Sequence, residues 1–148
     1  MLKKRGRDDS PQVEKNNTKK QKTNEEEDDF QAYGIDDRIA EKLKSKSIVS
    51  LFEVQKAVFK PIHKGKNVIV ASLTGSGKTL SFVLPVVQKA IDDNKLKSKI
   101  PFCMVITPTR ELSVQVAREF SDLSSGDLNF KTVLIYGGVS IEDQSNIN

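Results

Sequence analysis

One eight-residue segment constrains the fold of this chain more than any other feature: Ser72-Leu73-Thr74-Gly75-Ser76-Gly77-Lys78-Thr79. A short, β-branched apolar stretch at residues 67–71 precedes it, and apolar residues recur with helical spacing from Leu80 to Ile91 after it. A strand, a turn and a helix in this order are typical of a parallel sheet covered by helices. Gly75 and Gly77 lack a Cβ, so the backbone amides of the turn can approach phosphate oxygens closely. The segment therefore predicts a phosphate-binding loop at the N-terminus of a helix.

The last two residues of this loop predict nucleotide chemistry. Lys78 is placed to reach the β- and γ-phosphates of a nucleotide, and the Thr79 hydroxyl is placed to ligate Mg²⁺. We expect Lys78 and Thr79 to be the catalytic residues, Thr79 to be the metal ligand, and the whole loop to bind the cofactor through Ser72, Leu73, Thr74, Gly75, Ser76, Gly77, Lys78 and Thr79. The general pattern begins with glycine, where this chain has Ser72. The loop alone leaves a small-molecule kinase, a transporter ATPase and a helicase open.

Apolar patterning outside the loop predicts alternating strands and helices. Three β-branched apolar runs predict buried strands at residues 67–71, 102–106 and 132–136. Helical spacing predicts helices before the first run, between the runs, and through Pro85, which should kink its helix. The alternation predicts an α/β fold with a parallel sheet and flanking helices.

Local signals also predict where the helices begin and which residues they bury. Ile35, Ile39 and Leu43 recur every four residues after an acidic pair and predict a short amphipathic helix, and the next helix should bury Val54, Ala57, Val58 and Ile62. Ser50 and Glu53 have the spacing of a capping box and predict the start of that second helix. Thr107 followed by proline predicts the N-cap of a later helix that ends near residues 124–126.

The first 29 residues differ from the rest of the chain. They hold almost no apolar side chains, so we expect them to be a disordered charged tail. Basic clusters at residues 3–7 and 19–22 predict a nuclear import signal or an arm that touches nucleic acid, with a merely solvated tail as the alternative. The tail's basic and acidic charges cancel, which leaves the chain's net charge of +4 on residues 30–148.

Composition excludes several classes of protein and site. No apolar run approaches the roughly 20 residues of a membrane span. The chain has one cysteine and one histidine, which excludes cysteine-rich and histidine-based metal sites. We expect Cys103 to be buried and inert in its strand, and His63 to lie in solvent at a helix end.

Three further elements stand in a fixed order around the loop. Gln55 lies upstream, Pro108-Thr109-Arg110-Glu111-Leu112 follows the second apolar run, and Gly137-Gly138 follows the third. Together with the loop, this set resembles the first half of a DEAD-box RNA helicase over residues 30–148, and the residues around Gln55 are most similar to the nucleolar Gu-type branch. The resemblance implies a RecA-like P-loop domain that uses ATP and Mg²⁺ and has RNA as its partner.

The same resemblance assigns the remaining site residues. It implies that Gln55 reads the adenine edge and that Phe30 stacks on the base, within a Q motif at about residues 30–56. It implies contact with the RNA backbone through Pro108, Thr109, Arg110, Gly137 and Gly138. Ser47 and Glu53 replace the usual glycine and proline of the Q motif.

The Asp-Glu-Ala-Asp sequence that names the family does not occur after Thr79. We therefore interpret residues 30–148 as the N-terminal part of an incomplete first RecA-like domain, which would be inactive and marginally stable alone. The expected function is that of an ATP-dependent RNA helicase. Two alternatives remain: a non-catalytic ATP- and RNA-binding helicase fragment, and an unrelated P-loop ATPase or kinase. We expect a monomer without membrane association that is nuclear, with the nucleolus and the cytoplasm both left open.

Overall fold

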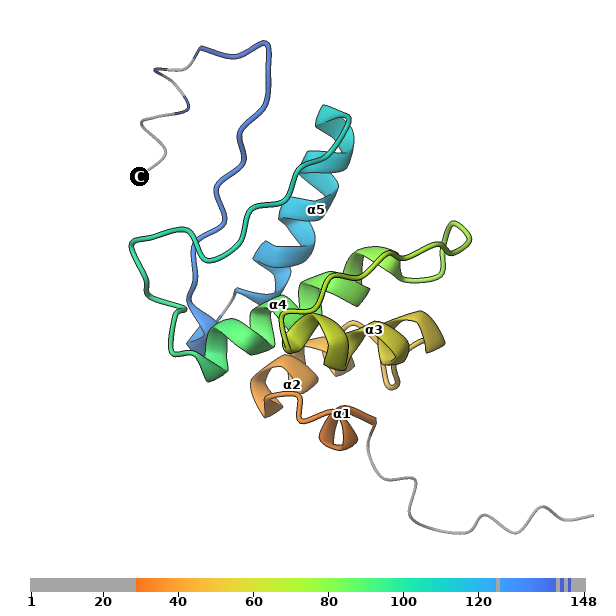
Figure 1. Cartoon of the computed structure of the whole chain (residues 1–148). Helices are drawn as coiled ribbons and strands as arrows, with labels where there is room; N and C mark the ends of the chain where they lie inside the picture. The colour runs from red at the N-terminus through yellow and green to blue at the C-terminus, as the bar shows by residue number, and fades with distance from the viewer. Residues whose placement is uncertain (1–28, 125, 141, 143, 145–148) are drawn as a thin grey trace, which may run out of the picture.

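The computed structural model describes residues 29–124, 126–140, 142 and 144 (Figure 1). The predicted disorder of the tail and its two basic clusters lie outside these residues. Asp29, which we assigned to the tail, instead begins the first helix, α1 (Asp29–Ala32). Its carboxylate binds Lys56 Nζ at 2.9 Å and thereby connects α1 to the third helix.

Helices form where apolar periodicity predicts them. The helices that follow α1 are α2 (Asp37–Ser45), α3 (Glu53–His63), α4 (Lys78–Asp92), α5 (Arg110–Leu123) and the short 3₁₀ helix η1 (Gly126–Leu128). Pro85 is buried within α4, which continues across it as one helix. The predicted apolar face of α3 is right for Val58 and wrong for Ala57, which is exposed, while Phe59 is buried instead.

The core lies where these helices meet. α4 packs against α3 and α5, and α2 also contacts α5, so α4 occupies the centre of the arrangement (Figure 1). The largest fully buried apolar side chains come from five elements, α1, α2, α4, α5 and η1: Phe30, Ile39, Leu43, Val83, Leu84, Leu123 and Leu128. Burial of these side chains from distant parts of the chain is the main source of stability in the described fold.

Two of the predicted helix starts are wrong by two residues or more. α3 has Phe52 as its N-cap, and the bond made there runs from the Phe52 N–H to Gln55 Oε1, at 2.9 Å, rather than to Ser50. α5 has Thr109 rather than Thr107 as its N-cap, because the Thr109 hydroxyl accepts a hydrogen bond from the Leu112 N–H at 3.2 Å. α5 begins with a side-chain cap, whereas the start of α3 is fixed by a hydrogen bond from the Phe52 backbone to the Gln55 side chain.

His63 lies at the end of α3 as predicted, but it is only partly exposed and it has a partner. Its Nε2 lies 2.7 Å from Asp92 Oδ2, and its ring stacks on Phe59 with a centroid separation of 6.1 Å. The contact joins the last turn of α3 to the last turn of α4. The sequence could not predict this partner of His63, because Asp92 lies on another helix.

The predicted sheet is not formed among the described residues. Residues 67–71, 102–106 and 132–136 carry neither helix nor strand, and no backbone hydrogen bond within the described chain joins any two of them. Several of their apolar side chains are open to solvent, with Ile69 99% and Met104 82% exposed, whereas Val68, Val70 and Leu134 are half-buried. Cys103, expected to be buried in a strand, is exposed as well. A strand needs a neighbouring strand for its hydrogen bonds, whereas a helix satisfies its backbone within its own segment.

None of the helices in the described part of the chain combines the length and the apolar composition that crossing a membrane requires.

Candidate functional site

The loop at residues 72–79 connects the first apolar run to α4 and turns sharply before the helix begins. Gly75 and Gly77 both have positive φ, at 81° and 79°, and Gly77 is the N-cap of α4. This backbone region strongly favours glycine. A Cβ at Gly75 would meet no atom within 4 Å, so the loop is open on that side. The amides of a glycine-rich turn and the positive end of α4 thus meet at a place that an anion can approach.

Lys78 closes the loop on itself in this structure. Its Nζ donates hydrogen bonds to the carbonyl oxygens of Ser72, at 2.7 Å, and of Leu73. The Ser72 hydroxyl also donates to Ser76 Oγ at 2.6 Å. An anion in the loop would compete with these carbonyl groups for the ammonium. The lysine is therefore in reach of the loop interior, as the sequence predicts, but is already engaged.

Gln55 lies directly against the loop. Its side chain is 3% exposed; Oε1 accepts from the Phe52 N–H at 2.9 Å, and Nε2 donates to the Gly77 carbonyl at 3.2 Å. The amide therefore ties the N-terminus of α3 to the N-terminus of α4. The structure brings the predicted base-reading residue to the loop, with both ends of its amide bound to backbone groups.

Phe52 is a neighbour of the loop that sequence reasoning missed. Its side chain is 56% exposed, yet a Cβ built on Gly77 would lie 2.8 Å from its Cδ2 and 2.4 Å from Gln55 Nε2. The one sequence feature that could have pointed to Phe52 is its position three residues, about one helical turn, before Gln55. The packing makes Gly77 the residue whose missing side chain lets Phe52 and Gln55 contact the loop.

Phe30, predicted to stack on adenine, lies in the hydrophobic core. Its side chain is 1% exposed, and it packs among the buried residues of α2 and α4. The Lys44 ammonium lies 5.7 Å from the centroid of its ring. Its stacking on a base stays a prediction, and it would require the core around Phe30 to open.

The predicted RNA-contacting residues form a second group at the start of α5. After η1 the chain runs back toward the N-terminus of α5 (Figure 1), which places Tyr136 beside Arg110. The Arg110 guanidinium lies 4.3 Å from the centroid of the Tyr136 ring, and its Nη2 donates to the Tyr136 hydroxyl at 3.2 Å. Because Gly137 follows Tyr136 directly, the two predicted RNA elements become neighbours although they are far apart in sequence.

Gln144 was not identified from the sequence. Its Oε1 accepts from the Tyr136 N–H at 2.9 Å, and its Nε2 donates to the carbonyl groups of Tyr136, at 3.1 Å, and of Val139, at 3.2 Å. One side chain thereby closes the turn through Gly137 and Gly138, where Gly138 has φ of 85°. No periodicity or short motif marks a glutamine that binds backbone eight residues away.

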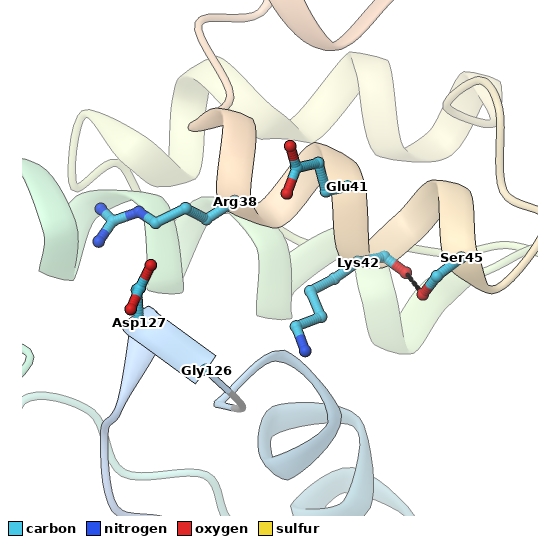
Figure 2. A pocket seen from close by; sticks show the side chains of 6 residues that line it. All are labelled: Arg38, Glu41, Lys42, Ser45, Gly126 and Asp127. Atoms are coloured by element: carbon cyan, nitrogen blue, oxygen red, sulfur yellow. Dashed lines mark hydrogen bonds between the residues drawn. The ribbon is translucent and has the colours of Figure 1, made fainter.

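Charged residues elsewhere form a shallow pocket between α2 and η1, away from the loop (Figure 2). It has a volume of about 320 Å³ and is lined by Arg38, Glu41, Lys42, Ser45, Gly126 and Asp127. Arg38 forms a bidentate pair with Asp36, at 2.8 Å for both contacts. This hydrogen bonding lowers the pKa of the Asp36 carboxyl below its ordinary value and raises the pKa of Arg38. The pocket contains none of the predicted site residues.

The described residues hold no group of three or more histidine, cysteine, aspartate or glutamate side chains arranged for a metal ion.

The chain matches a family model and several known proteins. Residues 52–147 match the model described as DEAD/DEAH box helicase. The sequence is 42% identical over 113 residues to "DEAD-box ATP-dependent RNA helicase 9" of Oryza sativa subsp. japonica, a match that covers 75% of this chain and 17% of the relative. It is 31% identical over 118 residues to "Nucleolar RNA helicase 2-B" of Xenopus laevis, covering 78% of this chain and 14% of that protein. The chain thus spans less than a fifth of the length of these relatives.

A solved structure is similar as well. The crystal structure of the RNA helicase Prp28 from Chaetomium thermophilum, bound to ADP, is 29% identical and superposes with a TM-score of 0.67. The match covers 78% of this chain and 28% of that one. The family match reaches from the N-cap of α3 through the loop, α4 and α5 to the turn at Gly137-Gly138, which are the elements described above. On this evidence the chain belongs to the DEAD/DEAH box helicase family.

Proposed function

We propose that this chain forms the nucleotide-binding part of an ATP-dependent RNA helicase. The observation that carries the proposal is the hydrogen bond from Gln55 Nε2 to the Gly77 carbonyl. It joins the element that resembles an adenine-reading motif to a phosphate-binding turn 22 residues away. ATP is the ligand that presents an adenine and a triphosphate together.

Each residue of the loop has a chemical task in this proposal. Amides of the turn from Ser72 to Gly77 would hold phosphate oxygens, and the Thr79 hydroxyl would hold Mg²⁺. Lys78 would release the Ser72 and Leu73 carbonyls and transfer its hydrogen bonds to the phosphates, since a charged acceptor is the stronger partner. Bound ATP would supply the phosphoryl group, and RNA would contact Arg110 and the Gly137-Gly138 turn.

The finer assignments belong to the same proposal. Residues 30–148 would be the N-terminal part of a RecA-like domain in which residues 67–71, 102–106 and 132–136 pair as parallel strands with each other or with further strands. The apolar, β-branched composition and the exposure of these segments support this assignment. The proposal also includes a monomer without membrane association and a nuclear location, with the nucleolus and the cytoplasm both left open. The basic clusters of the tail and the name of the Xenopus laevis relative support the nuclear location.

Titration with a fluorescent ATP analogue tests the nucleotide site. Lys78→Ala should lower the affinity by roughly 10- to 100-fold, which corresponds to loss of a hydrogen bond to a charged group. The matched control is Lys89→Ala in the same helix, whose ammonium pairs with Asp93 at 3.0 Å, and it should bind as the unchanged chain does. Absence of saturable binding by the folded, unchanged chain would overturn the proposal.

Helicase activity is tested separately with a short RNA duplex and ATP. We expect the full-length protein to separate the strands only with ATP, and Lys78→Ala to abolish the separation. Nucleotide and RNA binding without ATP turnover would instead support the non-catalytic alternative.

A further inference from the structure

The Arg110 side chain is held in place although it lies on the surface. Its guanidinium rests on the ring of Tyr136, 4.3 Å from the centroid, and donates to the hydroxyl of the same residue. No carboxylate in the described ranges forms an ion pair with it. The acidic neighbour in sequence, Glu111, is exposed in the first turn of α5, where it complements the helix dipole. The charge of Arg110 is therefore oriented by an aromatic ring and remains available to an anion.

The turn beside Arg110 is held by a second side chain. Gln144 binds the Tyr136 backbone through both of its amide atoms and also reaches the Val139 carbonyl. The Tyr136 backbone is thus fixed by Gln144, while the Tyr136 ring and hydroxyl fix Arg110. Gln144, Tyr136 and Arg110 form one connected chain of contacts across the exposed Gly137-Gly138 turn.

We propose that Tyr136 and Gln144 are positioning residues, which hold Arg110 and the Gly137-Gly138 turn together as one binding edge for the sugar–phosphate backbone of RNA. The inference rests on the proposed function, because it assumes that Arg110 and the turn contact RNA. A free arginine side chain samples many rotamers, and binding a phosphate fixes one of them at a cost in conformational entropy. The ring and the hydroxyl of Tyr136 fix the planar guanidinium beforehand, which reduces this loss.

The test measures RNA affinity of the full-length protein with a labelled single-stranded RNA at several salt concentrations. Arg110→Ala should weaken binding and lower the slope of log affinity against log salt by about 1, as loss of one phosphate contact does. Tyr136→Ala should weaken binding about five- to tenfold, and in the Arg110→Ala background it should have no further effect. Tyr136→Phe keeps the ring and should restore most of the affinity.

Gln144→Ala provides a second, independent variant that removes no aromatic ring. It should weaken RNA binding about threefold or more, since the turn and Tyr136 lose three hydrogen bonds. The matched control is Gln115→Ala, which changes an exposed glutamine of α5 and should leave RNA affinity unchanged. Nucleotide affinity, measured on every variant, should stay constant and shows that the loop at residues 72–79 is intact.

The outcomes separate this inference from the proposed function. If the unchanged protein binds no RNA, both fail together. If it binds RNA and Tyr136→Ala adds its loss to that of Arg110→Ala, or Gln144→Ala binds as tightly as the unchanged protein, the positioning inference is overturned while the helicase proposal stands.

Discussion

At Gly77, both the backbone conformation and the packing of neighbouring side chains favour glycine. Its φ of 79° lies in the left-handed region, and a Cβ there would lie 2.4 Å from Gln55 Nε2. Gly65 has a similar φ of 71° but open space around it. Comparing substitutions at Gly77 and Gly65 therefore separates the free-energy cost of a left-handed backbone from the cost of the steric contact with Gln55.

Gly77→Ala should destabilise the chain more than Gly65→Ala does. Both variants carry the cost of a left-handed alanine, about 1–2 kcal/mol, and only Gly77→Ala displaces Gln55 and Phe52. We expect a lower urea midpoint of the helical signal and weaker binding of a fluorescent ATP analogue for Gly77→Ala. Equal midpoints and equal nucleotide affinities for the two variants would show that the contact with Gln55 is unimportant.

Asp36 acts both as the N-cap of α2 and as the partner of Arg38. Its carboxylate accepts from the Arg38 backbone N–H at 3.0 Å and binds the guanidinium twice. The hydrogen bond from the Arg38 side chain is the main reason why the pKa of this carboxyl lies below its ordinary value in the folded chain. A lowered pKa contributes stability above the ordinary value, and this contribution is lost as the pH falls through the lowered one.

Asp36→Asn should therefore remove a pH-dependent part of the stability. Asparagine caps a helix about as well as aspartate, so the variant retains the cap and loses the charge pair. The urea midpoint of the variant should lie below that of the unchanged chain at pH 7; the difference should begin to shrink below about pH 4 and disappear once the pH has fallen through the lowered pKa. A difference that stays constant from pH 7 to pH 2 would contradict the assignment.

At the scale of elements, the helices could be predicted and the sheet could not. Ile39 and Leu43 lie one turn apart and buried inside α2, and Ile35 is buried just before its N-cap, so local sequence was enough to predict this helix. The start of α3 depends on Gln55, whose side chain also binds Gly77, and the capping-box spacing at Ser50 gave no sign of that. Apolar composition predicted buried, paired strands at residues 67–71, 102–106 and 132–136, but their pairing depends on distant chain and is not formed among the described residues.

The candidate site divides in the same way. The loop and Gln55 were predicted, because each belongs to a short motif whose residue types have a chemical reason. Tyr136 and Gln144 were not, because their contacts with Arg110 and with the turn exist only after the chain has folded back along α5. Phe30, predicted to stack on adenine, lies in the core instead, in a short helix that the sequence did not predict.

The start of α5 gives a prediction at this scale. Thr109→Ala removes the hydroxyl that accepts from the Leu112 N–H and should destabilise the first turn of α5 by about 1 kcal/mol. Ser50→Ala changes the residue that the sequence pattern identified as a cap, and it should leave α3 unchanged within about 0.5 kcal/mol. Amide hydrogen exchange at the first turn of each helix measures both effects. Faster exchange at the start of α3 in Ser50→Ala would show that Ser50 caps this helix, as the sequence pattern predicted.

On the scale of the whole molecule, the described part of the chain combines a helical core with exposed apolar segments. Ile69, Met104, Ile106 and Ile135 are among the most exposed large apolar residues of the described chain. In soluble proteins, large exposed apolar patches are rare and commonly mark interaction sites or a tendency to aggregate. The packing of α2 to α5 and the exposure of these segments therefore have opposite effects on the solubility and stability of the folded chain.

This conflict predicts how the 148-residue chain behaves alone. It should bind the dye ANS strongly without denaturant, because the exposed segments offer apolar surface, and it should lose its helical signal over a broad temperature range. Replacing Ile69 and Ile135 by threonine keeps a β-branched side chain and removes apolar surface, so the double variant should bind less ANS while its helical signal is unchanged. Extending the chain to the length of its helicase relatives should also reduce ANS binding, since parallel strands are normally covered on both faces. A sharp thermal transition without ANS binding in the 148-residue chain would show that these segments are already packed in solution.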